Sequence, residues 1–291
     1  MAGTKKLYHK DAYLREFCAR VLSCTPCADG MFNVVLDETA FYPEGGGQPA
    51  DHGALGAARV MDVQLQGEAV VHRTTAPLRV GETVQGNIDW ARRFDHMQQH
   101  TGEHITSGII KSRFGFDNLG FHMGRESVVL ECSGQLDAAQ LAELELAVNE
   151  VICRNGEVRA WFPRPDELAG LTYRRKKEIE GDVRIVDAAG ADVCACCGTH
   201  VARAGEVQLA KFTGVTRHKG HTVIEALFGA RRPAKGPRRS APPVCPAGTA
   251  LPRPQTAPAA PALRQGRFAP TRRVRPARAG VPEAVGQNKR R

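Results

Sequence analysis

The chain has 291 residues, of which 42% are hydrophobic, and this is enough for two modest domains that each have a core. It contains no run of about 18 apolar residues, so we expect no membrane-spanning helix and no membrane partner. The nine cysteines are scattered and odd in number, and no secretory signal precedes them. These features indicate a cytoplasmic protein.

The net charge of +9 is distributed unevenly along the chain. Of 40 basic and 31 acidic residues, 15 basic and one acidic lie in residues 231–291, so this segment carries +14 and the remainder −5. The segment also holds 12 of the 18 prolines and few branched apolar residues, which predicts a disordered tail over 233–291. Two interpretations stay open. The tail is either a basic arm with nonspecific affinity for nucleic acid or out-of-frame translation of GC-rich DNA.

Residues 1–90 have the pattern of a small β-barrel. Short β-type runs at 20–22, 32–36 and 68–72 are separated by glycine and proline at intervals of roughly ten residues. Within this region, Gly45, Gly46 and Gly47 permit positive φ and leave backbone N–H groups accessible to a phosphate or sugar. The alternative interpretation of these glycines is a flexible hairpin tip.

From Trp90 the pattern becomes helical as far as Ile110, and a strand is expected near Phe121. A second helix is predicted to begin after Asp137, with Gln140 in the capping-box position and Gly156 just past its end. Strands are expected at 183–186 and 223–227. The fold class is therefore predicted as α+β, with a second domain over residues 91–232.

Two short motifs carry side chains that bind metals. His100 and His104 are four residues apart, so both imidazoles lie on one face if the segment is helical. Cys196 and His200 form a second pair, and Gly198 between them suggests a tight loop. Three histidines and a cysteine suit tetrahedral zinc, which predicts one Zn²⁺ per chain. The alternative for the histidine pair is a solvated helix face.

Four segments of the chain together resemble a known protein family. In order along the chain they are residues 41–51 with the three glycines, 96–104 with both histidines, Gly120-Phe121-His122-Met123-Gly124, and 194–201 with the cysteine-histidine motif. This combination is similar to the free-standing alanyl-tRNA editing proteins of the AlaX type, which resemble the editing region of alanyl-tRNA synthetase. The resemblance extends from about residue 4 to 232. It implies an N-terminal barrel, then an α/β editing domain with one zinc bound by His100, His104, Cys196 and His200.

The chain departs from the family pattern at several positions. The family's Cys-Gly-Gly-Thr-His is Cys-Cys-Gly-Thr-His here, so Cys197 adjoins the expected ligand Cys196. Position 103, often glutamine or a small residue in relatives, is Glu103. The usual basic residue near Gly220 is missing. Longer family members continue into a folded C-terminal domain where this chain has its Pro/Arg-rich tail, which leaves any oligomerisation or RNA contact of that domain in doubt.

The resemblance implies a trans-editing hydrolase that removes serine from mischarged Ser-tRNA(Ala), and it leaves activity on Gly-tRNA(Ala) open. Such an enzyme is needed because an alanine pocket cannot exclude glycine and rejects an added hydroxyl only about a hundredfold. Thr101 and Thr199 are candidates for recognising the serine hydroxyl, unless local backbone satisfies them. Glu103 is a candidate general base; otherwise it is a helix-surface carboxylate or a partner of a ligand histidine.

Contacts with tRNA are expected at the glycine motif, Gly45 to Gln48, and at basic residues that are otherwise solvated faces: Arg92, Arg93, Arg174, Arg175 and Lys176. Two other functions stay open. Four protein ligands fill a tetrahedron, which suits an RNA-binding module with a structural zinc. His100 to His104 also reads His-x-x-Glu-His, the inverted zinc-peptidase signature, which would need a downstream glutamate ligand.

Overall fold

The computed structural model describes residues 3–175, 181–218 and 220–231. The predicted tail over 233–291 and the predicted RNA contact Lys176 lie outside these residues. Within the described part, none of the helices is both long and apolar enough to cross a membrane. The predicted domain boundary near residue 90 and the cytoplasmic location stay predictions.

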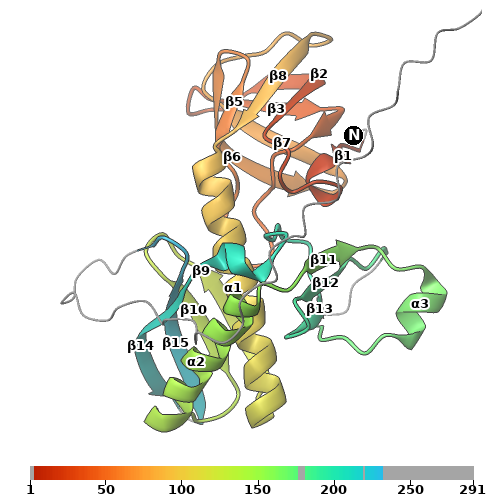
Figure 1. Ribbon diagram of the computed structural model, residues 1–291. Helices are drawn as coiled ribbons and strands as arrows, with labels where there is room; N and C mark the ends of the chain where they lie inside the picture. The colour runs from red at the N-terminus through yellow and green to blue at the C-terminus, as the bar shows by residue number, and fades with distance from the viewer. Residues whose placement is uncertain (1–2, 176–180, 219, 232–291) are drawn as a thin grey trace, which may run out of the picture. The chain divides into compact units, whose positions relative to one another are not determined.

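Six strands near the N-terminus form a closed barrel in the order β2-β3-β7-β6-β5-β8 (Figure 1). They are β2 (Glu16–Pro26), β3 (Phe32–Leu36), β5 (Gly53–Leu55), β6 (Ala58–Gln66), β7 (Ala69–Thr74) and β8 (Thr83–Ile88). Side chains alternate between exposed and buried along β2, and the buried ones join a core that includes Val34, Leu36 and Phe41. The β runs predicted at 20–22, 32–36 and 68–72 fall in or overlap β2, β3 and β7. Before β2, the 3-10 helix η1 (Leu7–His9) follows β1 (Lys5–Lys6), which pairs with β4 (Glu38–Thr39).

The helix α1 (Trp90–Phe114) follows the last barrel strand. The Asp89 side chain caps it by accepting from Arg92 N, and Gly115 ends it with a left-handed φ of 74°. Every residue from His96 to Ile110 is buried. A helix buried on all sides brings its polar side chains into the interior, so His100 and His104 do not lie on the solvated face that was the alternative interpretation.

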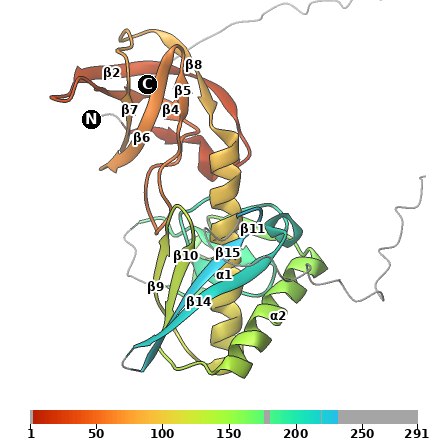
Figure 2. The ribbon, with the colours of Figure 1, turned by 90° about the vertical axis from the view of Figure 1, so that its left-hand side faces the viewer.

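Four strands of the second region form a sheet in the order β14-β15-β10-β9: β9 (Asn118–Met123), β10 (Val128–Cys132), β14 (Ala210–His218) and β15 (His221–Phe228). The helix α1 contacts β9, β10 and β15, and α2 (Ala138–Arg154) contacts β14 and α1 (Figures 1 and 2). The capping box predicted for Asp137 and Gln140 is confirmed. The helix ends at Arg154 and its C-cap Asn155 takes the left-handed conformation with φ 51°, so Gly156 lies just past the end as predicted.

A third sheet has the order β11-β12-β13 and leads directly into the cysteine-histidine motif. It comprises β11 (Val158–Trp161), β12 (Ile185–Ala188) and β13 (Val193–Ala195), with α3 (Pro165–Gly170) between the first two and the 3-10 helix η2 (Ala204–Val207) after the motif. The strand predicted at 183–186 begins two residues later. The α+β class is confirmed by these sheets and helices.

Candidate metal centre and active site

The glycine motif is a tight turn. Gly45 and Gln48 exchange two backbone hydrogen bonds of 3.0 Å, and the two central glycines have φ of 61° and 83°, as in a primed two-residue hairpin turn. A Cβ on Gly47 would lie 2.5 Å from the Phe121 ring, so a larger residue does not fit. Gly47 O also accepts from Met123 N at 3.1 Å, which holds the turn against β9.

Gln48 connects this turn to both predicted ligand motifs. Its Oε1 is 2.8 Å from His100 Nδ1 and accepts from Thr199 N, and its Nε2 donates to Thr199 Oγ1 at 2.9 Å. The side chain is 0% exposed. An RNA contact needs a side chain at the surface, which the structure does not provide for Gln48. Gly46 and Gly47 are exposed and Gly45 is partly buried, so their predicted RNA contacts stay predictions.

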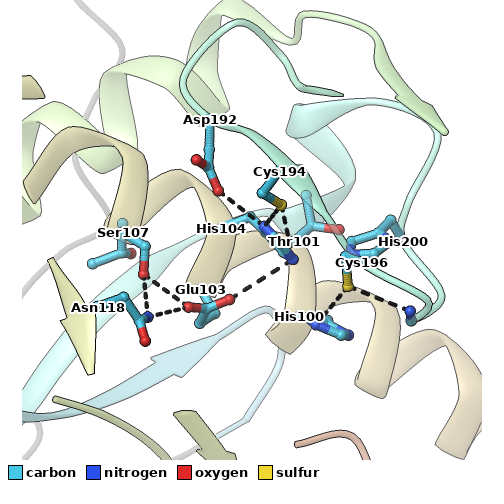
Figure 3. A network of polar contacts seen from close by, with 12 residues as sticks. His100, Thr101, Glu103, His104, Ser107, Asn118, Asp192, Cys194, Cys196 and His200 are labelled. Carbon is cyan, nitrogen blue, oxygen red and sulfur yellow. Dashed lines mark hydrogen bonds and ion pairs between the residues drawn. The ribbon is translucent and has the colours of Figure 1, made fainter. Parts of the chain in front are cut away.

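The structure brings the four predicted metal ligands together (Figure 3). Ligand atoms of His100, His104, Cys196 and His200 all lie within 4.8 Å of one another. Cys196 Sγ is 3.5 Å from His100 Nε2 and 3.8 Å from His200 Nε2. Zinc bonds of about 2.0 Å to nitrogen and 2.3 Å to sulfur, at a tetrahedral angle, separate such atoms by about 3.5 Å. The cluster could therefore hold a metal ion.

The pKa shifts of Cys196 and His200 suit metal binding. For His104, burial lowers the pKa, but the nearby Cys194 and Glu103 outweigh burial and raise it well above the ordinary value. Burial opposes ionisation of the Cys196 thiol, but the nearby histidines, His100 foremost, outweigh it when they are protonated and hold the thiol pKa well below the ordinary value. Burial lowers the pKa of His200 to about 3, so its imidazole is neutral. His200 Nδ1 is buried and has no hydrogen-bond partner among the described residues. A thiolate and neutral imidazoles are the forms that bind metals.

The loop that carries Cys196 is held by Arg184, which the sequence did not single out. Arg184 is 4% exposed, and its Nη1 donates to Cys196 O at 3.0 Å and to Gly198 O at 2.9 Å. A Cβ on Gly198 would lie 2.1 Å from His100 Cε1, so only glycine allows the loop to approach the helix this closely. The tight loop predicted from Gly198 is confirmed.

On the other side of the cluster, Asp192 orients His104. Asp192 Oδ2 lies 3.0 Å from His104 Nδ1 (Figure 3). The same oxygen accepts a hydrogen bond from Arg174 Nη2 at 2.5 Å. Burial would raise the pKa of Asp192, but the hydrogen bonds from His104 and Arg174 outweigh it and lower that pKa. A carboxylate that accepts a hydrogen bond from one ring nitrogen leaves the other nitrogen, Nε2, available to bind an ion. Cys194 Sγ is 2.9 Å from the same Nδ1, and burial raises the pKa of its thiol to about 11.

Three arginines that were predicted to contact tRNA phosphates differ in their exposure. Arg174 is largely buried and is committed to Asp192, so the structure gives it a positioning role rather than a surface one. Arg93 is fully buried in an ion pair with Asp51, which removes it from any contact with RNA. Arg175 is exposed and stays a prediction.

Glu103 is 1% exposed, so the alternative that it lies on the helix surface is wrong. Its Oε1 accepts from Ser107 Oγ at 2.8 Å and from Asn118 Nδ2 at 2.6 Å, and its Oε2 is 3.8 Å from His104 Nε2 (Figure 3). The carboxylate is therefore fixed beside a candidate ligand. Its role as a base stays a prediction.

The two candidate threonines are also buried. Thr101 Oγ1 accepts from Val201 N at 3.2 Å, and Thr199 Oγ1 accepts from Gln48. The alternative interpretation was that local backbone satisfies each hydroxyl. In both of these hydrogen bonds the donor is instead distant in sequence. Each hydroxyl ties the helix or the barrel turn to the loop that carries Cys196 and His200.

Comparison with known proteins finds relatives whose sequences resemble this chain. Residues 16–92 match the family of class II (A) tRNA synthetases, and residues 183–225 match the second additional domain of threonyl and alanyl tRNA synthetases. The chain is 35% identical over 225 residues to the alanyl-tRNA editing protein Aarsd1 of Danio rerio, covering 72% of this chain and 55% of the relative. It is 32% identical over 219 residues to the alanyl-tRNA editing protein AlaX-L of Pyrococcus horikoshii, covering 71% and 53%.

Over most of its length the chain is therefore similar to alanyl-tRNA editing proteins. It is also 34% identical over 242 residues to an alanine–tRNA ligase of Ignicoccus hospitalis, of which it covers 26%. The chain spans little more than half the length of the two editing relatives it matches. The matched segment 183–225 contains Arg184, Asp192, Cys196 and His200, so the family likeness includes one half of the cluster.

Proposed function

We propose that the chain is a trans-editing deacylase that hydrolyses the ester between serine and tRNA(Ala), with Gly-tRNA(Ala) as a second candidate substrate. The observation that carries this proposal is the buried cluster of His100, His104, Cys196 and His200 in a chain that is similar to alanyl-tRNA editing proteins. In this proposal residues 91–232 form a zinc-containing editing domain that follows a barrel over 1–90. The protein acts in the cytoplasm, where mischarged tRNA is produced.

The donor set fits zinc, and we propose one Zn²⁺ per chain. A bound zinc would supply a positive centre that polarises or anchors the aminoacyl ester. The chain's own residues define the geometry around it: Gln48 fixes His100 through Nδ1, and Asp192 fixes His104 in the same way. Such fixed partners orient the imidazoles before any ligand arrives.

Glu103 is the proposed base that takes a proton from the attacking water. Its burial and its hydrogen bonds from Ser107 and Asn118 support this by fixing the carboxylate on α1 beside His104. The remaining alternative is that Glu103 only orients His104. The two roles differ in what Glu103→Gln does to turnover at full zinc occupancy.

Discrimination between serine and alanine is assigned in this proposal to Thr199, with Thr101 as the second candidate. Thr199 lies next to His200 in the loop, and its hydroxyl is 1% exposed and held by Gln48. A buried hydroxyl positioned in this way can bond the serine hydroxyl and loses that partner when alanine binds.

The same four-donor cluster favours one other function. Four protein ligands complete a tetrahedron, and a full tetrahedron is typical of a structural zinc. An RNA-binding module with a structural zinc is therefore the second candidate. The peptidase alternative needs a glutamate ligand, whereas the candidate metal-binding groups among the described residues contain only histidine, cysteine and aspartate.

The test is a deacylation assay with zinc-loaded protein on Ser-, Gly- and Ala-tRNA(Ala) side by side. The proposal expects hydrolysis of Ser-tRNA(Ala), with Ala-tRNA(Ala) spared. If zinc-loaded protein hydrolyses neither mischarged tRNA but still binds tRNA, the editing function is refuted and the RNA-binding module remains.

A further inference from the structure

A second site lies on α1, one turn before the metal cluster. A hollow of about 620 Å³ is lined by residues from the end of the glycine motif, the start of α1, the turn after β9 and the end of β15. Its lining residues are Pro49, His52, Ala91, Arg92, Asp95, His96, Gly124, Arg125 and Arg231. Of these residues, Arg92 was predicted from the sequence as a tRNA contact, and the others have no role in the assignments above.

The hollow is strongly basic. Arg92, Arg125 and Arg231 line it, and Asp95 is the single carboxylate in that lining. Arg231 is paired with Asp95 at 2.6 Å and donates to Gly124 O, so it is fixed in place. Arg92 uses Nε for Ala50 O at 3.0 Å. Within the described residues no hydrogen bond or ion pair involves the side chain of Arg125, which is exposed. An excess of two positive charges therefore faces the hollow.

His96 adds an unsatisfied polar atom to the wall. It is 3% exposed, lines the hollow, and its Nδ1 has no hydrogen-bond partner among the described residues. A buried nitrogen without a hydrogen-bond partner is unfavourable, so a ligand that pairs with it is favoured. Burial and, after it, the positive charges of Arg92 and Arg231 together lower the pKa of His96 to about 3. The imidazole is thus neutral and able to donate one hydrogen bond to an anion.

The hollow and the cluster are adjacent along the same helix. His96 precedes His100 by four residues, a rise of about 6 Å, and both residues are buried on α1. The glycine motif borders both sites, since Pro49 lines the hollow and Gln48 contacts His100. In an aminoacyl-tRNA the nearest anion to the ester is the phosphate of the same terminal nucleotide. The cluster and the hollow are likewise neighbours, so the ester could lie at the cluster while this phosphate lies in the hollow.

We propose that the hollow lined by Arg92, Arg125, Arg231 and His96 binds a phosphate group, and that this phosphate belongs to the acceptor end of the tRNA whose ester lies at the cluster. The second part rests on the proposed deacylase function; the first does not. Guanidinium groups bind phosphate in a bidentate manner, which fixes position as well as charge. The residues of the hollow are then positioning residues, and they do not take part in bond cleavage.

The experiment uses the zinc-loaded full chain and three variants. Arg125→Gln removes one charge from the hollow, Arg125→Lys keeps it, and Arg79→Gln removes one exposed charge from the barrel as the matched control. Affinity for uncharged tRNA(Ala) is measured from low to moderate salt, affinity for inorganic phosphate is measured by calorimetry, and kcat and KM are measured on Ser-tRNA(Ala).

Arg125→Gln is expected to weaken tRNA binding about tenfold and to reduce the slope of log affinity against log salt by about 0.7–0.9. KM should rise by a similar factor while kcat is retained, because the contact is remote from the ester. Arg125→Lys should retain the salt slope, and Arg79→Gln should resemble the unchanged protein. Inorganic phosphate should bind the unchanged protein more tightly than Arg125→Gln.

Two results would overturn the proposal. Equal effects of Arg125→Gln and Arg79→Gln on all three measurements would show that the hollow is no phosphate site. Phosphate binding that depends on Arg125, with tRNA affinity unchanged, would show a site for free phosphate and refute the assignment to tRNA. Failure of the deacylase itself is distinct: no ester would be hydrolysed by any variant, while the Arg125 effects on phosphate and tRNA binding would persist.

Discussion

The metal cluster and the arginine hollow lie one turn apart on α1, and they differ in how completely their polar atoms are paired. In the cluster, Gln48 and Asp192 hold two of the imidazoles, and Arg184 holds the loop that brings the other two donors. In the hollow, His96 Nδ1 has no partner among the described residues and Arg125 is exposed. Side chains that are already held by hydrogen bonds suit catalysis at a metal ion. Hydrogen-bond donors without a partner, around an open hollow, suit the binding of a larger anion. The following changes test that division.

The largest effect is expected from Cys196→Ala. The unchanged protein, purified without added metal, should contain about one zinc per chain by elemental analysis. Cys196→Ala should lose most of it together with deacylation, because the lowered pKa makes Cys196 a thiolate ligand and alanine removes that ligand. Cys197→Ala is the matched control and should keep both, since Cys197 is the exposed neighbour. Normal zinc in both Cys196→Ala and His200→Ala would refute the ligand assignment.

Glu103→Gln should reduce kcat on the order of a hundredfold or more at unchanged zinc content, because it removes the proposed base. The amide is close in size to the carboxylate, so the contacts with Ser107 and Asn118 change least in this substitution. Zinc content and kcat are measured on the same preparation. Near-normal turnover would leave Glu103 as a residue that orients His104.

Asp192→Asn should weaken zinc binding about 10–100-fold, as expected when the partner of a ligand histidine is lost. The change also removes a charge that Arg174 pairs with, so Arg174 is left partly buried without its carboxylate. Zinc affinity is measured by competition with a chelator. Asp182→Asn, at an exposed position, is the control. Equal zinc affinity in both variants would contradict the orienting role.

Thr199→Val should reduce selectivity for Ser-tRNA(Ala) over Ala-tRNA(Ala) about tenfold, since the serine hydroxyl loses a buried partner. Thr199→Ser keeps the hydroxyl and should keep the selectivity. The ratio of kcat/KM for the two substrates is the measurement, with zinc content checked alongside because Gln48 links Thr199 to His100. If Thr199→Val keeps the full ratio and Thr101→Val lowers it, the discriminating group is Thr101.

Local spacing could predict the cluster but not what holds it. His100 and His104 are four residues apart, as are Cys196 and His200, and the capping box at Asp137 is equally local, so each is visible in the sequence. Gln48 is separated from His100 by 52 residues and Asp192 from His104 by 88. Such pairs form only because the barrel turn and the third sheet pack against α1. This packing cannot be predicted from the spacing or the type of the residues. For the same reason Gln48 and Arg174 were interpreted as surface contacts.

The smallest effect is expected from shortening the chain to residues 1–232, which separates affinity due to the hollow from affinity due to the basic segment. The residues removed, 233–291, hold 13 basic residues and one acidic residue and so carry +12, a charge that can bind RNA without specificity. The shortened chain should keep its zinc and its kcat on Ser-tRNA(Ala). It should lose at most a small part of its tRNA affinity, and mainly at low salt. Arg125→Gln in the shortened chain should then give the same or a larger loss of affinity than in the full chain, because less nonspecific binding masks it. Loss of zinc or of cooperative thermal unfolding in the shortened chain would show that the predicted boundary at 232 is wrong. Disappearance of the Arg125→Gln effect would show that the basic segment and the hollow act together.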